Sequence, residues 1–186
     1  MKKAICKLKS MGPYSQSKQV EMEKKSKELP KEYEKRTWRE RCHTTDDEYI
    51  FIPPLQFANS LKTAAKYLAM KIPGEGNAKY TKNFEAGVMV FNGLKLPIKI
   101  QDVEGEWVLV PSDGRRGGSK KVMKCFPLIR NWSGTVTYEI IDDIITEDIF
   151  EQVVKASGQF IGIGRFRPKN WGYYGRFIVE SIKWIE

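Results

Sequence analysis

The feature that most constrains the fold is the order in which two hydrophobic periods occur along the chain. Residues 3–9 and 134–141 alternate apolar and polar side chains, the two-residue period of a strand with one buried face. Residues 54–71 place apolar side chains at three- and four-residue steps, which predicts a helix. A second helix is predicted at 147–157 and a closing strand at 174–184. With short strands between the two helices, this order predicts an α+β fold on a ferredoxin-like (RRM-like) β-α-β-β-α-β scaffold.

Local signals predict where these elements end. Pro53-Pro54 stands at the start of the first helix, where proline is tolerated, and Pro73-Gly74 is expected to end it. Thr146 is expected to cap the second helix, and Gly158 is expected to form its exit. Shorter strands are predicted at 86–91, 95–100 and 106–110, separated by Asn-Gly and Glu-Gly turns.

The chain is expected to form a single domain over residues 1–186. Two segments interrupt the pattern, and neither is a domain linker, because neither flank is a complete core alone. Residues 10–48 are polar and charged, and we interpret them as an N-terminal insertion. Residues 111–131 begin with glycines and cations, and we interpret them as a thumb-like basic loop or hairpin.

The charge balance predicts an anionic partner. Thirty-two Lys and Arg residues against 23 Asp and Glu residues give a net charge of +9, which favours binding to a polyanion. No apolar run approaches the roughly 20 residues that a membrane span requires, so no membrane partner is predicted. Cys6, Cys42 and Cys125 are odd in number and form no CxxC pair, which predicts a reducing, cytoplasmic setting without a metal site. No cofactor is predicted.

The segment 162–177, GIGRFRPKNWGYYGRF, combines four glycines, four cations and five aromatic residues with no acidic residue. Gly162 and Gly164 permit close approach of the backbone to a ligand. Three cations are predicted to neutralise phosphates, and two rings are predicted to stack on unpaired bases, each stack contributing on the order of 1–3 kcal/mol. These residues are Arg165, Arg167 and Lys169, with Trp171 and Tyr173. The alternative is that Phe166 and Phe177 belong to the core and the glycines only shape a turn.

A second glycine- and cation-rich segment, GRRGGSKK at 114–121, is followed by Lys124. Cationic loops of this kind suit a phosphate backbone, because they follow it without reading bases. The predicted phosphate contacts are Arg115, Arg116, Lys120, Lys121 and Lys124. Solvated charge is the alternative for this segment alone, but two acid-poor segments in one chain favour polyanion binding.

A third segment, 36–47, adds Arg36 and Arg39 to the predicted nucleic-acid contacts and contains the only histidine. An enzyme hypothesis assigns RNA cleavage to His43, Asp46 or Asp47. The carboxylates equally suit a turn cap or an ion pair with a nearby arginine. We favour a protein that is not an enzyme.

Two stretches resemble the RAMP superfamily. Residues 44–66, TTDDEYIFIPPLQFANSLKTAAK, resemble its acidic loop and the segment that opens its first helix, and residues 172–180, GYYGRFIVE, resemble its glycine-rich loop running into the last strand. The superfamily comprises CRISPR-associated RNA-binding proteins, including backbone subunits of type I and type III effector complexes. The resemblance implies a modified ferredoxin-like fold with a single strand lying across repeated subunits, and it makes residues 111–131 comparable to a thumb hairpin.

The favoured hypothesis is a binder of single-stranded RNA or DNA that assembles side by side along its ligand. One alternative is an RNA-processing endoribonuclease of the RAMP type. Another is a mimic that inhibits a CRISPR complex by replacing a backbone subunit. A stand-alone binder from a phage or other mobile element uses the same physics.

Overall fold

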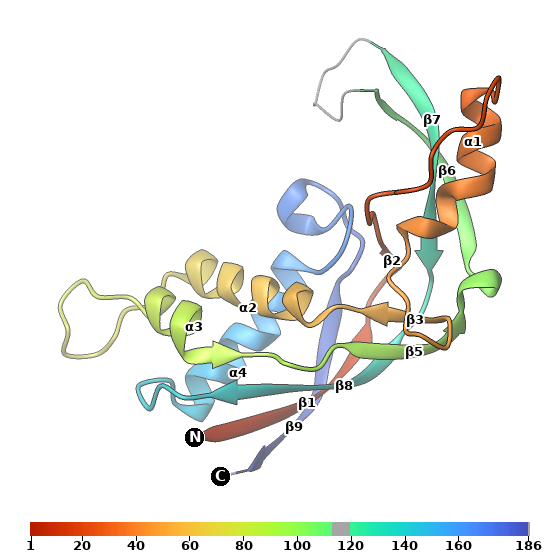
Figure 1. Ribbon diagram of the computed structural model, residues 1–186. Coiled ribbons are helices and arrows are strands. Elements are labelled where there is room, and N and C mark those ends of the chain that lie inside the picture. The colour runs from red at the N-terminus through yellow and green to blue at the C-terminus, as the bar shows by residue number, and fades with distance from the viewer. Residues whose placement is uncertain (113–119, 186) are drawn as a thin grey trace.

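A four-stranded antiparallel sheet with helices on one face forms the body of the protein in the computed structural model, which describes residues 1–112 and 120–185 (Figure 1). From edge to edge the strands are β4 (Val88–Met89), β8 (Ser133–Ile140), β1 (Lys2–Ser10) and β9 (Phe177–Ile185). The covering helices are α2 (Pro54–Leu68) and α4 (Glu147–Ala156). Along the chain these four strands come in the order β1, β4, β8 and β9. In the sheet the second strand therefore lies at one edge, followed by the third, the first and the fourth, which is the ferredoxin-like arrangement. The predicted fold class is therefore confirmed.

The core lies between the sheet and these two helices. The alternation predicted for the first strand is present in β1, where Ala4, Cys6 and Leu8 are fully buried. Phe57 of α2 and Phe150 of α4 are fully buried against the sheet, and complete burial of such a side chain contributes about 1.5–3 kcal/mol.

A second sheet projects from the body. Its order is β2 (Tyr14–Ser15), β7 (Lys121–Ile129) and β6 (Glu104–Pro111). The antiparallel strands β6 and β7, called the hairpin below, extend away from the four-stranded sheet alongside α1 (Pro30–Thr37) (Figure 1). A further pair is formed by β3 (Tyr49–Ile52) and β5 (Leu94–Lys99). The other helical segments are η1 (Trp38–Arg41), α3 (Thr81–Gly87), η2 (Ile100–Asp102), η3 (Ser157–Ile161) and η4 (Pro168–Asn170).

Both predicted scaffold helices are present, but their C-terminal ends differ from the prediction. α2 ends at Leu68 because Ala69 adopts a left-handed conformation with a φ of 49°, so Pro73-Gly74 does not end it. Thr146 caps α4 as predicted, since its side chain accepts a hydrogen bond from the Ile149 N–H. Gly158 is not the exit, because the chain continues as the π-helical turn η3. A Cβ at Gly158 would lie 2.1 Å from the Phe177 carbonyl oxygen, so this glycine is required by close packing on β9.

The strands predicted at 95–100 and 106–110 are present as β5 and within β6, whereas the strand predicted at 86–91 is only partly present. The first half of the predicted strand 86–91 is wrong, because helix α3 occupies its beginning and only Val88–Met89 pairs with β8. Glu104-Gly105 opens β6 and does not form a turn. Strand β9 begins at Phe177 and not at 174, because Gly175 has a left-handed φ of 73° and belongs to the preceding loop.

Residues 10–48 contribute more to the core than their polar composition indicates. Tyr14, Trp38 and Cys42 are buried and belong to the main hydrophobic core. Their separation along the chain hid them from a search for periodic apolar residues. The insertion is therefore an integral part of the structure that supports the hairpin.

The three cysteines are buried and form no disulfide. Burial raises the pKa of the Cys6 and Cys42 thiols to about 12, so both remain protonated at neutral pH. In the part of the chain that the structure describes, no helix combines the length and apolar character needed to cross a bilayer.

Candidate nucleic-acid interface

The predicted aromatic segment is a compact loop, residues 162–176, called the tail loop below. Gly162, Gly164 and Gly175 have left-handed φ values of 71°, 73° and 73°. A Cβ at Gly175 would lie 1.8 Å from the Ile163 carbonyl oxygen, and one at Gly172 would lie 1.7 Å from the Phe166 carbonyl oxygen. The glycines thus let the loop fold tightly on itself. Gly162 is buried, so its role in the structure is this packing and not an open backbone surface for a ligand.

The tail loop also holds two aromatic residues in an unfavourable backbone conformation. Phe166 and Trp171 have left-handed φ values of 60° and 65°, which cost on the order of 1–3 kcal/mol each. The Trp171 side chain is 82% exposed and that of Tyr173 is 63% exposed. Backbone strain that presents large rings to solvent is typical of binding surfaces.

The N-terminal insertion anchors the tail loop from one side. The Arg165 N–H donates to the Ser15 carbonyl oxygen at 2.8 Å, and the Gly175 N–H donates to the Pro13 carbonyl oxygen at 2.7 Å. A Cβ at Gly164 would lie 2.4 Å from the Tyr14 ring, so the loop backbone packs directly on this residue.

The hairpin anchors the tail loop from the other side. The Arg165 guanidinium lies 3.5 Å from the centroid of the Phe126 ring on β7, a close cation–π contact. The Tyr174 hydroxyl donates to Glu106 Oε1 on β6 at 2.7 Å. Burial and this carboxylate raise the pKa of Tyr174 to about 12, so the hydroxyl keeps the proton that it donates. The tail loop and the base of the hairpin therefore meet at Phe126 and Glu106. Of the cationic segment predicted at 114–121, residues 114–119 lie outside the described residues.

The predicted cations of the tail loop differ in their surroundings. Burial lowers the pKa of Arg165, although an arginine at this depth still carries its charge. Arg167 Nη1 donates to the Gly164 carbonyl oxygen at 3.0 Å, so this side chain braces the loop. Of these three predicted cations, only Lys169 is exposed, whereas Arg165 and Arg167 are half-buried.

On the hairpin, Lys120 and Lys121 are exposed and Lys124 is half-buried. Arg115 and Arg116 lie outside the described residues. Arg36 and Arg39 belong to the α1–η1 segment. Arg36 binds Glu28 through its Nε and Nη2 atoms at 2.8 and 3.0 Å, and Arg39 stacks 4.2 Å above the Trp38 ring. The charge of Arg36 is therefore already neutralised.

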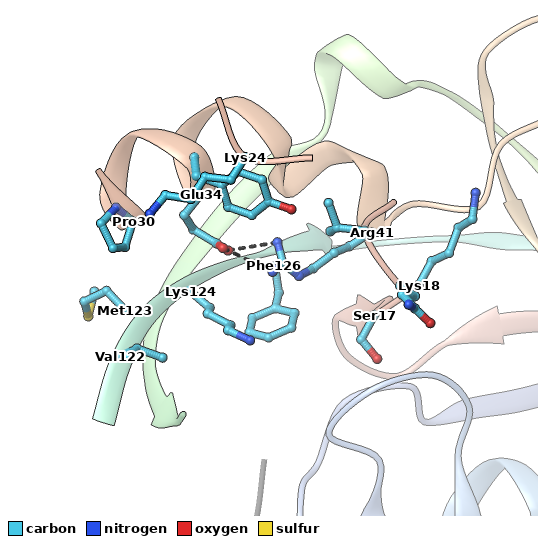
Figure 2. A pocket seen from close by; sticks show the side chains of 13 residues that line it. Ser17, Lys18, Lys24, Pro30, Glu34, Arg41, Val122, Met123, Lys124 and Phe126 are labelled. Carbon is cyan, nitrogen blue, oxygen red and sulfur yellow. Dashed lines mark hydrogen bonds and ion pairs between the residues drawn. The ribbon is translucent and has the colours of Figure 1, made fainter. Parts of the chain in front are cut away.

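The sequence prediction missed a buried ion pair that joins α1 to the hairpin. Arg41 Nη1 lies 2.8 Å from Glu34 Oε1, and the two side chains are only 9% and 7% exposed (Figure 2). Glu34 also accepts a hydrogen bond from the Cys125 N–H at 2.8 Å, and Arg41 donates to the Cys125 carbonyl oxygen at 3.2 Å. The pair thus occupies the edge of β7 just beyond its short pairing with β2. No spacing rule in the sequence indicates that these two side chains bind a strand so far along the chain.

The candidate catalytic residues lie near the start of β3. His43 is half-buried, and burial together with the positive charge of Lys18 lowers its pKa. Asp47 accepts hydrogen bonds from Lys95 and Thr45, which lower the pKa of its carboxyl, and Asp46 is exposed. Within residues 1–112 and 120–185, no hydrogen bond or ion pair joins the His43 side chain to either aspartate.

The fold and the site together define an α+β protein with a ferredoxin-like body, a projecting hairpin and a glycine-rich aromatic loop at its base. No protein-family model and no curated protein matches the chain. Among solved structures, 31 chains match. One of them, from the cryo-EM structure of the Type III-B Cmr-beta bound to cognate target RNA, is 10% identical, with a TM-score of 0.55. The match covers 100% of this chain and 61% of that one, so this protein spans about three-fifths of its length. The predicted resemblance is thus confirmed for the fold alone.

Proposed function

We propose that this chain is an RNA-binding protein that holds an unpaired strand across the tail loop and the hairpin. The observation that carries the proposal is the pair of exposed rings, Trp171 and Tyr173, on a strained loop fastened to a lysine-bearing hairpin. RNA is proposed over DNA because the solved structure with a similar fold is bound to target RNA.

The side chains divide into three roles. Trp171 and Tyr173 stack on bases, and four lysines neutralise phosphates, namely Lys120, Lys121, Lys124 and Lys169. Arg165 and Arg167 position the loop, because their guanidinium groups already contact Phe126 and the Gly164 carbonyl oxygen. This assignment uses interactions with the backbone and with base faces, so it favours binding with little dependence on base sequence.

Salt dependence tests the proposal. For single strands the logarithm of the affinity falls with the logarithm of the salt concentration by about 0.7 per neutralised phosphate. The double variant Lys120→Gln/Lys121→Gln is therefore expected to reduce this slope by about 1.4, as measured by fluorescence anisotropy with an unstructured RNA. Lys82→Gln/Lys183→Gln, which changes two exposed lysines on α3 and β9, is the matched control and should keep the wild-type slope. Affinity that does not respond to salt would refute the proposal.

The same complexes report on two further parts of the proposal. We propose that copies assemble side by side along the strand, so the number of chains per RNA, measured by analytical ultracentrifugation, should rise with RNA length. One chain per RNA at every length contradicts this assembly.

We also propose that binding does not cleave RNA, so the recovered RNA should be intact with and without magnesium. Cleavage that His43→Ala abolishes would favour the endoribonuclease alternative.

A further inference from the structure

A groove of about 550 Å³ runs between the hairpin and the N-terminal insertion, outside the tail loop (Figure 2). Three segments form it: the extended residues 17–20 with Lys24, helix α1 with Arg41 of the following η1 turn, and residues 122–126 of β7. Its size lies within the 300–1,000 Å³ range that is usual for ligand sites. Apolar side chains contribute to its walls, among them Val20, Pro30, Val122 and Met123.

The charges that line the groove are unequal in sign. Four cations and one carboxylate contribute, namely Lys18, Lys24, Arg41 and Lys124 against Glu34. Because Glu34 pairs with Arg41, three lysines remain, a net charge of +3 (four minus one). Within the described residues, none of these three lysines takes part in an ion pair. Glu21 and Glu23 lie on the same extended segment but do not line the groove.

The groove borders the proposed RNA surface at strand β7. Phe126 lines the groove and also carries the Arg165 guanidinium of the tail loop above its ring. Lys124, two residues earlier on β7, lines the groove as well. The Glu34–Arg41 pair holds α1 to the backbone of Cys125, so the groove has a fixed wall and does not depend on a ligand to form.

We propose that this groove is a second contact site for the sugar-phosphate backbone of the same RNA strand. The strand leaves the tail loop at Phe126 and continues between β7 and residues 17–24, where Lys18, Lys24 and Lys124 face its phosphates. The N-terminal insertion is therefore part of the RNA-binding surface. This inference rests on the proposed function and extends its footprint.

The test compares two double variants on the same segment. Lys18→Gln/Lys24→Gln removes two groove lysines, whereas Lys25→Gln/Lys27→Gln removes two exposed lysines that do not line the groove. Dissociation constants are measured with single-stranded RNAs of increasing length at fixed salt. Short RNAs should bind all proteins alike. Long RNAs should bind the groove variant about 2- to 30-fold more weakly than the control, as expected for two surface charge contacts.

Two further measurements keep the outcome clear. The salt slope on long RNA should fall by about 1.4 in the groove variant alone. Photocrosslinking of wild-type protein to RNA that contains 4-thiouridine should label Tyr33, which lines the groove. If wild type binds RNA but the two variants are indistinguishable at every length, the groove inference is wrong and the proposed function stands. If wild type binds no RNA, both are wrong. A groove variant that loses only the binding of a polyglutamate peptide would identify a protein site and overturn the inference.

Discussion

The double variant Trp171→Ala/Tyr173→Ala is expected to lose most of the affinity for single-stranded RNA. Each base stacked on an aromatic side chain contributes about 1–3 kcal/mol, so the pair contributes roughly 2–6 kcal/mol. The loss should be similar for uridine-rich and adenine-rich RNA, because every base presents a face for stacking. Fluorescence anisotropy with both RNAs measures it.

The fold should survive this change, because both side chains are largely exposed and exposed substitutions usually alter stability by less than about 0.5 kcal/mol. Thermal unfolding checks this point. Phe91→Ala provides the control, since Phe91 is 62% exposed on the connection between β4 and β5, away from the tail loop in sequence. Equal losses in the double variant and the control, or no loss in either, would remove the stacking role from Trp171 and Tyr173.

The second large effect concerns stability. Glu34→Ala is expected to lower the free energy of unfolding by roughly 3–5 kcal/mol, because it leaves Arg41 buried and unpaired. It also removes the acceptor of the Cys125 N–H. For a protein of this size the melting temperature should fall by about 6–20 °C. Differential scanning calorimetry gives the value.

An exposed arginine–glutamate ion pair provides the control. Arg130 donates to both carboxylate oxygens of Glu104, with side chains that are 63% and 57% exposed. Glu104→Ala should therefore leave the melting temperature close to that of the wild type, because water already screens this pair. If the Glu34→Ala and Glu104→Ala variants have the same melting temperature, the buried Glu34–Arg41 pair does not stabilise the packing of α1 on the hairpin.

The scaffold could be predicted because its signals are local. Residues 2–10 bury every second side chain, and the stretch that became α2 repeats its apolar residues at helical steps. Helix ends were less predictable, because alanine carries no signal for the left-handed conformation that Ala69 adopts. Likewise, an Asn-Gly or Glu-Gly dipeptide indicates a turn, but the neighbouring strands decide whether a turn forms. Glu104-Gly105 instead belongs to β6 and pairs with β7.

The candidate site was predictable only in part. The tail loop was identified by its composition, but the exposure of Trp171 and Tyr173 and the burial of Phe177 depend on how the loop packs. Glu106 was not associated with the loop, since nothing in the local sequence brings its carboxylate to Tyr174. The groove was not predicted at all, because it is formed by three separate segments.

The amino-acid order by itself determined the scaffold strands and the two helices that cover them, the net charge, and where aromatic and cationic residues are concentrated along the chain. These properties follow from neighbouring residues and from the period of each element. Only the tertiary structure decided that Arg165 docks on Phe126, that Glu34 and Arg41 bind the edge of β7, and that three lysines line one groove. Such contacts depend on strand register and on the packing of distant segments, because a side chain meets its partner only after the whole core has fixed their relative positions.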